Sequence, residues 1–331
     1  MMFRTILTVL LTVLACSCNG QNTNANTITD ATPMPINRFD KALYELICSG
    51  DTTLQAALLE QYPEMTEILG KGVLNMQSPS QPGFFAKLRS FYSEPTLKKF
   101  YGDAIEKYAA TGEMEQKLGN AFAWLHGQFP AMQIPALYMH VSGLSQNILV
   151  GDSLLSLSID KYMGMDYPLY QDFFYDYQMR KMQPQMVVPD YVAGWLMSEY
   201  PFAGKENVLL ERMIYEGKIK YVVLSALPDI SAAELMGYTE AGLKWCEENE
   251  AEIWKAIIER KHLYTPDLMT TTKYFEEAPS QFLSDGAPGC IGTWVGLQIV
   301  KRYMSETNAS IETLMKNEDA QDILTASKYK P

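Results

Sequence analysis

The strongest constraint on the fold is a row of glycines at the start of a helix near the C-terminus. In GAPGCIGTWVGLQIVKRYM, residues 286–304, Gly289, Gly292 and Gly296 recur at spacings of three and four and therefore share one helix face. A face without side chains lets a neighbouring backbone approach closely. Such a helix start can also bind an anion, but no GK[ST] motif follows the glycines. We therefore predict that the three glycines are structural and that Gly292→Leu unfolds the domain.

The first residues predict export and a lipid anchor. A single basic residue, Arg4, precedes an apolar run over residues 5–15. This run is shorter than the roughly 20 residues of a membrane span and is typical of an export signal. Cys16 and Cys18 follow, each directly after a small residue, which resembles the lipobox of bacterial lipoproteins. Either cysteine fits as the lipidated one, and a plain cleaved signal peptide is the alternative.

The chain divides into three parts. Residues 1–18 form the predicted lipoprotein signal peptide. Residues 19–35 are polar and rich in Asn and Thr, so they bury little and predict a disordered tether that holds a folded body off a membrane. Residues 36–331 contain no repeat and no low-complexity linker, which predicts a single α-rich globular domain.

Charge and cysteine usage narrow the classes of function. The formal net charge of −12 argues against a nucleic-acid partner, which requires a basic face. Beyond the two N-terminal cysteines, Cys48, Cys246 and Cys290 are odd in number and form no CxxC, so we expect free thiols. Cys290 lies at a helix start, where a thiol pKa can fall, but no histidine is near it in the sequence to act as a base.

The periodicity of apolar residues predicts a mostly helical α+β fold. Helical spacing dominates from residue 36 to 129 and again after residue 165. Ser93 as a cap with Pro95 in the first turn predicts one helix start, and a capping box of Ser231 and Glu234 predicts another. Between about residues 135 and 160 the pattern alternates, as in ALYMHVSG and SQNILVGDSLLSLSIDKYMG. We expect three short antiparallel strands here, forming a small sheet flanked by helices, because no crossover helix separates them as a parallel sheet would require.

The usual signatures of catalysis are missing from the sequence. Its three histidines, His126, His140 and His262, include no pair at i, i+4 that could hold zinc from one helix. No serine lies in a G-x-S-x-G motif. Asp172 and Asp176 share one helix face, a spacing more typical of a solvated helix edge than of acid–base work. We therefore expect no catalytic residue, no metal ligand and no cofactor.

Four segments together resemble the gliding-motility lipoprotein family known as GldB. They are INRFDKALYE, RMIYEGKIKYVV, GYTEAGLKWCEENEAEIW and APGCIGTWVGLQIVKRYM, and the resemblance spans most of the chain after residue 34. The predicted lipoprotein signal agrees with it independently. The resemblance implies a lipid-anchored protein of the bacterial cell envelope, on the periplasmic or the outer-membrane side.

The same family is distantly similar to zinc-dependent proteases. In those proteins a helix with HExxH follows a small sheet, and a later helix carries a Glu-Gly pair. This chain keeps Glu216 and Gly217 in MIYEGKIKY but has no HExxH in PDYVAGWLMSEYP. Without imidazoles, one glutamate cannot hold the metal that hydrolysis requires. The resemblance therefore implies a degenerate zincin-like body without metal, with Glu216, Glu199 and His140 as candidates for a vestigial site.

Two functions follow from the sequence. The first is a non-enzymatic envelope lipoprotein, an accessory of gliding or secretion that acts through contacts with proteins or ligands. Its partners would be the membrane, through the lipid, and envelope proteins that the sequence does not identify. The alternative is an atypical metal-dependent hydrolase or peptidase around Glu199, Glu216 and His140. A vestigial cleft that binds a peptide or a glycan is compatible with the first function.

Overall fold

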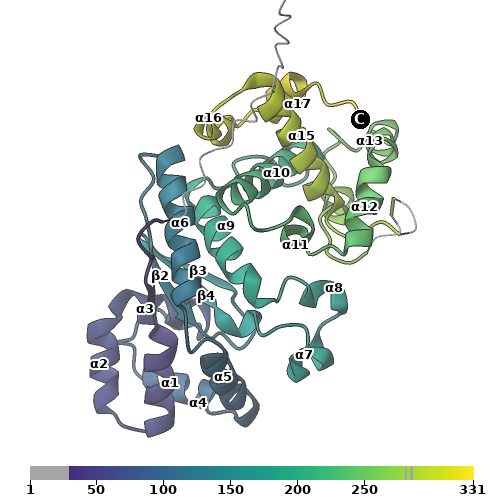
Figure 1. Cartoon of the computed structure of the whole chain (residues 1–331). Coiled ribbons are helices and arrows are strands. Elements are labelled where there is room, and N and C mark those ends of the chain that lie inside the picture. Colours follow the sequence, from purple (N-terminus) through teal and green to yellow (C-terminus); the bar gives the residue numbers. More distant parts are fainter. Residues whose placement is uncertain (1–29, 280–281, 284–285) are drawn as a thin grey trace, which may run out of the picture.

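The computed structural model describes residues 30–279, 282–283 and 286–331 (Figure 1). The predicted signal peptide with Cys16 and Cys18, and residues 19–29 of the predicted tether, lie outside the described residues. Within the described ranges, no helix combines the length and the apolar character that crossing a membrane requires.

Six helices precede the main strands of the sheet. They are α1 (Phe39–Ser49), α2 (Thr53–Gln61), α3 (Pro63–Gly72), α4 (Phe84–Tyr92), α5 (Pro95–Lys107) and α6 (Gly112–Gln128). Pro95 begins α5 as the sequence predicts, because its fixed φ suits the first turn. The cap is not Ser93, however, since the Glu94 carboxylate accepts from the Leu97 N–H at 2.7 Å.

The sheet contains four strands in the order β1-β2-β4-β3. They are β1 (Ile36–Asn37), β2 (Ala136–His140), β3 (Ile148–Val150) and β4 (Leu154–Ser158). Only β3 and β4 pair antiparallel, whereas β2 pairs parallel with both β1 and β4. The predicted antiparallel pairing is therefore wrong for β2. Strand β3 itself serves as the return segment between β2 and β4, so the parallel pair needs no crossover helix.

The remaining helices surround the sheet and build the C-terminal part. They are the 3₁₀ turns η1 (Ile159–Lys161) and η2 (Pro184–Met186), and the α-helices α7 (Pro168–Phe173), α8 (Asp176–Met179), α9 (Val187–Glu199), α10 (Leu209–Ala226), α11 (Ala232–Met236), α12 (Glu240–Glu248), α13 (Glu250–Glu259), α14 (Leu268–Lys273), α15 (Ile291–Thr307), α16 (Ile311–Lys316) and α17 (Ala320–Ser327). Ser231 and Glu234 form the predicted capping box of α11. The predicted class, mostly helical with a small flanked sheet, is confirmed.

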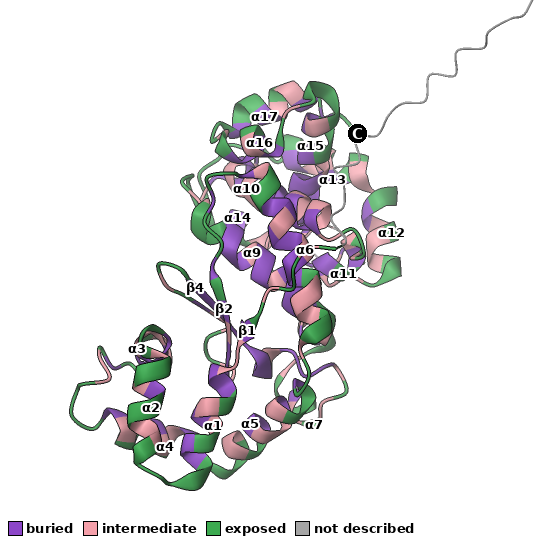
Figure 2. Ribbon diagram, turned by 60° about the vertical axis from the view of Figure 1, so that its left-hand side comes forward, coloured by how far each residue is buried: buried purple, intermediate pink, exposed green. Residues whose placement is uncertain are grey.

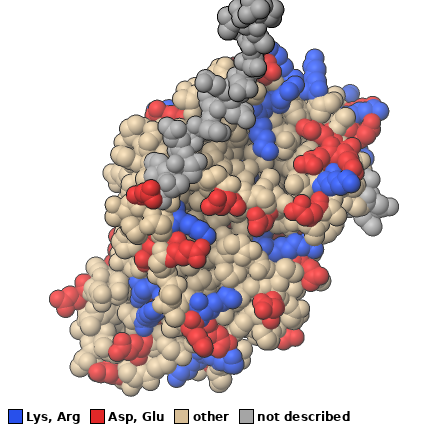
Figure 3. Space-filling view, viewed as in Figure 1, with Lys and Arg blue, Asp and Glu red and all other residues tan. Residues whose placement is uncertain are grey.

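Helix α10 contributes to both hydrophobic clusters of the protein (Figures 1 and 2). Its C-terminal half, with Val222 and Val223, packs with the sheet, α9 and the N-terminal helices. Its N-terminal half, with Met213 and Ile214, packs with α12, α13, α15 and α17. On the face shown in Figure 3, acidic and basic side chains are interspersed rather than gathered into one patch.

The described end of the predicted tether is packed against α6. The Ala31 N–H donates to Asn120 at 3.1 Å, and the Gln116 amide donates to the Ala31 carbonyl at 2.7 Å. A β carbon on Gly119 would lie 2.3 Å from a backbone oxygen of this segment. Residues 30–35 therefore belong to the folded body, because backbone groups of Ala31 and Met34 are hydrogen-bonded to α6.

Gly292 and Gly296 lie on α15, but Gly289 precedes the helix and is separated from it by the left-handed Cys290, so the predicted shared helix face is wrong for Gly289. A β carbon on Gly296 would lie 1.8 Å from the Met213 carbonyl oxygen of α10, and one on Gly289 would lie 2.1 Å from the Glu277 carbonyl oxygen. At Gly292 the nearest atom is at the end of the Phe275 ring, at 2.9 Å. Two of the three glycines thus face main chain, and Gly292 faces a side chain.

Candidate functional site

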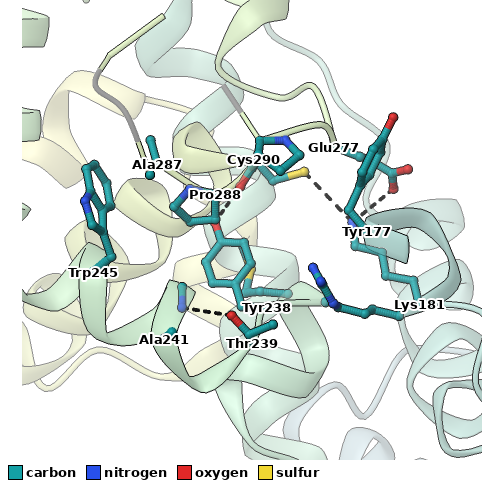
Figure 4. Close-up of a pocket in the computed structure, with 17 residues that line it drawn as sticks. Tyr177, Lys181, Tyr238, Thr239, Ala241, Trp245, Glu277, Ala287, Pro288 and Cys290 are labelled. Atoms are coloured by element: carbon teal, nitrogen blue, oxygen red, sulfur yellow. Dashed lines mark hydrogen bonds and ion pairs between the residues drawn. The ribbon is translucent and has the colours of Figure 1, made fainter. Parts of the chain in front are cut away.

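A surface cavity of about 430 Å³ lies beside the first turn of α15 (Figure 4). We call it the Cys290 cavity. It is enclosed by α8 and the two residues after it, by the junction of α11 and α12, and by the segment that leads into α15. Its walls are aromatic at one end, around Trp245, and charged at the other, around Lys181 and Glu277.

Local backbone geometry shapes the cavity. Gly237 ends α11 with φ 69°, a left-handed conformation that favours glycine. The Thr239 hydroxyl then caps α12 by accepting from the Gly242 N–H at 3.0 Å. Cys290, the residue before α15, is also left-handed, with φ 53°, and its N–H donates to the Glu276 carbonyl at 2.8 Å. A non-glycine residue in this conformation is strained, and such strain often accompanies functional sites.

The charged end of the cavity centres on Lys181. Its ammonium lies 3.1 Å from the Glu277 carboxylate and 3.9 Å from the Cys290 sulfur. The Cys290 thiol also lies 3.4 Å from the Phe275 carbonyl. Burial raises the pKa of Cys290, although Lys181 opposes the shift. The thiol therefore stays protonated near neutral pH and is a poor nucleophile.

A second layer of charged groups interacts with these residues. The Tyr162 hydroxyl donates to the Asp190 carboxylate at 2.7 Å. Burial raises the pKa of Asp190, although Tyr162 and the ammonium groups of Lys220 and Lys181 oppose the shift. Burial and the nearby Lys181 lower the pKa of Lys220, while Asp190 and Glu216 oppose that shift. Opposite charges thus compensate one another here.

Two tyrosines line the cavity in addition to Trp245. The Tyr238 hydroxyl donates to the Gly289 carbonyl at 2.7 Å and so fixes its ring against the segment before α15. Tyr177 lies at the charged end, beside Glu277 and Lys181 (Figure 4), and stacks on Tyr175, with ring centroids 5.6 Å apart. Tyr175 is 71% exposed, so this pair of stacked rings leads from the charged end of the cavity to solvent.

The structure does not gather the three predicted vestigial-site residues into one site. His140 is fully buried on β2, where its ring nitrogens lie 2.7 Å from the Ser156 hydroxyl and 3.3 Å from the Gln146 carbonyl. Burial lowers the pKa of His140 to about 3. Glu199 is exposed at the end of α9 and lines a separate cavity of about 190 Å³. Glu216 on α10 is half-buried and interacts electrostatically with Lys220 and Cys290.

The residues present do not fit the zinc ion that the distant protease similarity implies. His126 is exposed on α6, His140 is buried in the sheet, and His262 lies 2.9 Å from the Tyr274 hydroxyl. Across the described ranges, no group of three or more His, Cys, Asp or Glu side chains is placed to hold a metal. The ammonium groups of Lys181 and Lys220 interact electrostatically with Asp190, and that of Lys220 also interacts with Glu216. These positive charges would repel a divalent cation bound to the two carboxylates.

Sequence reasoning missed Lys181, Asp190 and Lys220. They come from the segment before η2, from α9 and from α10, so no short motif joins them. A signal did exist for Asp190, which is the single charge within the otherwise apolar helix segment VVPDYVAGW, but not for Lys220, which follows Glu216 and Lys218 in the same helix. A lone charge of this kind is expected to have a buried partner.

The fold and the site define a mostly helical α+β protein with a half-open, amphipathic surface cavity next to a tightly packed helix crossing. The chain belongs to the family described as gliding motility protein GldB, whose model matches residues 21–331. The resemblance noted from the sequence is thereby confirmed. No curated protein and no solved structure matches the chain. Membership indicates a lipoprotein related to gliding motility and associated with the cell envelope.

Proposed function

We propose that the protein is a non-enzymatic accessory of the gliding or secretion machinery. It is held to an envelope membrane by a lipid on Cys16 or Cys18, and it acts by contact. The Cys290 cavity is the contact site, and the ligand is a protein segment or another envelope component.

The pairing of the charged groups in and behind the cavity carries this proposal. Lys181 pairs with Glu277, and Asp190 accepts from Tyr162 with two ammonium groups nearby. A general base or nucleophile needs an accessible group with a suitable pKa, and the Cys290 thiol is shifted the other way. The Lys181–Glu277 ion pair beside aromatic walls instead suits recognition of a ligand.

Complementation of cells that need this protein for gliding or secretion tests the proposal. Glu216→Gln removes the one carboxylate that a zincin-like site would require, and we expect full function to remain. Arg180→Glu reverses the charge of a half-buried cation that lines the cavity, and we expect loss of function without unfolding because Arg180 forms no salt bridge within the described residues. Arg89→Glu, the same charge reversal at a half-buried residue of α4, is the matched control and should retain function.

Metal analysis of the purified wild-type protein completes the test. The alternative, an atypical metal-dependent hydrolase, predicts stoichiometric zinc that is lost in Glu216→Gln together with peptide hydrolysis and function in cells. That combination would show that the contact proposal is wrong. Retained function in Glu216→Gln with loss in Arg180→Glu supports it.

A further inference from the structure

The charges at the polar end of the Cys290 cavity do not cancel. Arg180 and Lys181 line it as cations and Glu277 as an anion. Glu277 pairs with Lys181 at 3.1 Å. Among the described residues, no carboxylate forms a salt bridge with Arg180, which is half-buried. The described lining of the cavity therefore has one positive charge in excess, on a planar guanidinium that suits two-point binding of a carboxylate.

The opposite end offers apolar contact area. Trp245, Tyr238 and Pro288 line it, and Figure 4 places Trp245 across the cavity from Lys181 and Glu277. Aromatic side chains that are already fixed, as Tyr238 is through its bond to the Gly289 carbonyl, bind apolar groups with little further loss of entropy.

We propose that the Cys290 cavity binds a peptide segment of a partner protein that presents an aromatic or proline side chain next to a carboxylate. The apolar side chain lies between Trp245 and Tyr238, and the carboxylate pairs with Arg180. This inference rests on the proposed contact function and specifies the partner's chemistry. A C-terminal carboxylate and an Asp or Glu side chain share that chemistry.

A peptide fits the lining better than a glycan. Sugar recognition relies on several amide and carboxylate side chains that bond the hydroxyl groups of the ring. The described part of the lining contains no Asn or Gln, and the one carboxylate in it, Glu277, is already paired with Lys181. A volume of about 430 Å³ accommodates a few side chains and suits a short peptide segment.

Titration of the full-length protein in detergent with peptides tests the inference. Calorimetry measures the affinity, and the fluorescence emission of Trp245 reports binding at the cavity. Trp245→Phe identifies that reporter signal among the five tryptophans. The first probe is N-acetyl-Gly-Pro-Phe with a free carboxylate, and its amide is the matched control. N-acetyl-Phe-Asp-Gly amide carries the carboxylate on a side chain instead and distinguishes the two sources.

We expect the acid to bind about tenfold more tightly than its amide, as for one charge-assisted hydrogen-bonded pair. Arg180→Gln should remove this preference, Arg180→Lys should retain part of it, and Arg89→Gln, an equal charge change on α4, should leave it intact. Equal affinity for acid and amide, an unchanged preference in Arg180→Gln, or binding of chitohexaose in place of the acid would show that the inference is wrong.

Mass spectrometry of the peptides after incubation separates this inference from the proposed function. Peptide that binds and stays intact supports both. Peptide that binds and is cleaved supports the site but contradicts a non-enzymatic role. Peptide that stays intact without binding contradicts the inference and leaves the contact function standing.

Discussion

Gly217 on α10 and Gly296 on α15 face each other where the two helices cross. A β carbon on Gly217 would lie 2.3 Å from the carbonyl carbon of Gly296. In the Glu-Gly pair that resembles a protease motif, the glycine, Gly217, therefore allows the two helices to pack closely. The same crossing sets Glu216 and Lys220 of α10 close to Cys290, the residue before α15.

The crossing should not tolerate even a methyl group. In Gly296→Ala the added carbon meets the Met213 carbonyl, which is main chain and cannot move away. We expect a loss of about 3 kcal/mol in the free energy of unfolding, measured by urea denaturation. Gly127→Ala in α6 is the control, because no atom lies within 4 Å of its added carbon. Equal stability of the two variants would contradict a crossing set by backbone contact.

Gly292→Leu should unfold the domain, since even its β carbon lies 3.1 Å from the Tyr274 β carbon. Gly292→Ala should cost less than Gly296→Ala, because the Phe275 ring end at 2.9 Å can rotate away. Thermal denaturation followed by circular dichroism gives the order of stability of these variants. A melting curve of Gly292→Leu like that of the wild type would refute the structural role of this glycine.

Arg38 should be needed to keep Asp40 buried. Its guanidinium binds both oxygens of the fully buried Asp40, at 2.9 and 2.6 Å. Burial already raises the pKa of Asp40, and Arg38 opposes that shift. Arg38→Ala should therefore cost about 3 kcal/mol at about pH 7. The loss should shrink at about pH 5, because the unpaired carboxyl then binds a proton more readily in the folded than in the unfolded state.

His140 should make the protein sensitive to acid. Its pKa is about 3 when folded and about 6.5 when unfolded, so the folded state binds fewer protons and stability falls as the pH drops below about 6.5. At about pH 5 this contribution amounts to about 2 kcal/mol. His140→Gln should remove this part of the slope in urea denaturation across the range. An unchanged slope would mean that the imidazole is not held neutral.

The three cysteines of the body should differ in reactivity. Iodoacetamide at about pH 7.5 should modify the exposed Cys48 first. Cys290 should react more slowly despite its place at a helix start, because burial raises its pKa. Cys246 should react only after unfolding, since burial raises its pKa to about 12. Peptide mass spectrometry over time gives the order, and Cys290 labelled as fast as Cys48 would contradict the protonated thiol.

Local signals made much of the fold predictable. Ser231 with Glu234 and Pro95 marked helix starts because caps and prolines act within one turn of the chain. The alternation of apolar and polar residues correctly predicted strands near residues 136–158. Strand direction was not predictable, because β4 lies between β2 and β3 and pairs parallel with β2, and β1 joins from about 100 residues earlier; no local pattern records these partners.

The cavity was predictable only in its parts. The glycines and Cys290 stood out, since each departs from an ordinary helix start. The pairing of Lys181 with Glu277 joins residues 96 positions apart, and that of Tyr162 with Asp190 joins residues 28 apart. Such pairs exist only once the helices pack, so spacing along the chain cannot reveal them. Predicting Glu199, Glu216 and His140 as one site relied on family resemblance, and they lie apart.

The packing of residues 30–35 on α6 determines which contacts first bear a force applied to the N-terminal segment. A pull along the N-terminal segment is resisted first by the Gln116 and Asn120 side chains and then by β1 on the edge of the sheet. Because β1 pairs with β2 over Ile36 and Asn37 only, such a pull acts on a short stretch of hydrogen bonds. The α10–α15 crossing and the Cys290 cavity take no part in these bonds, so a force on residues 30–35 reaches them only through the rest of the fold.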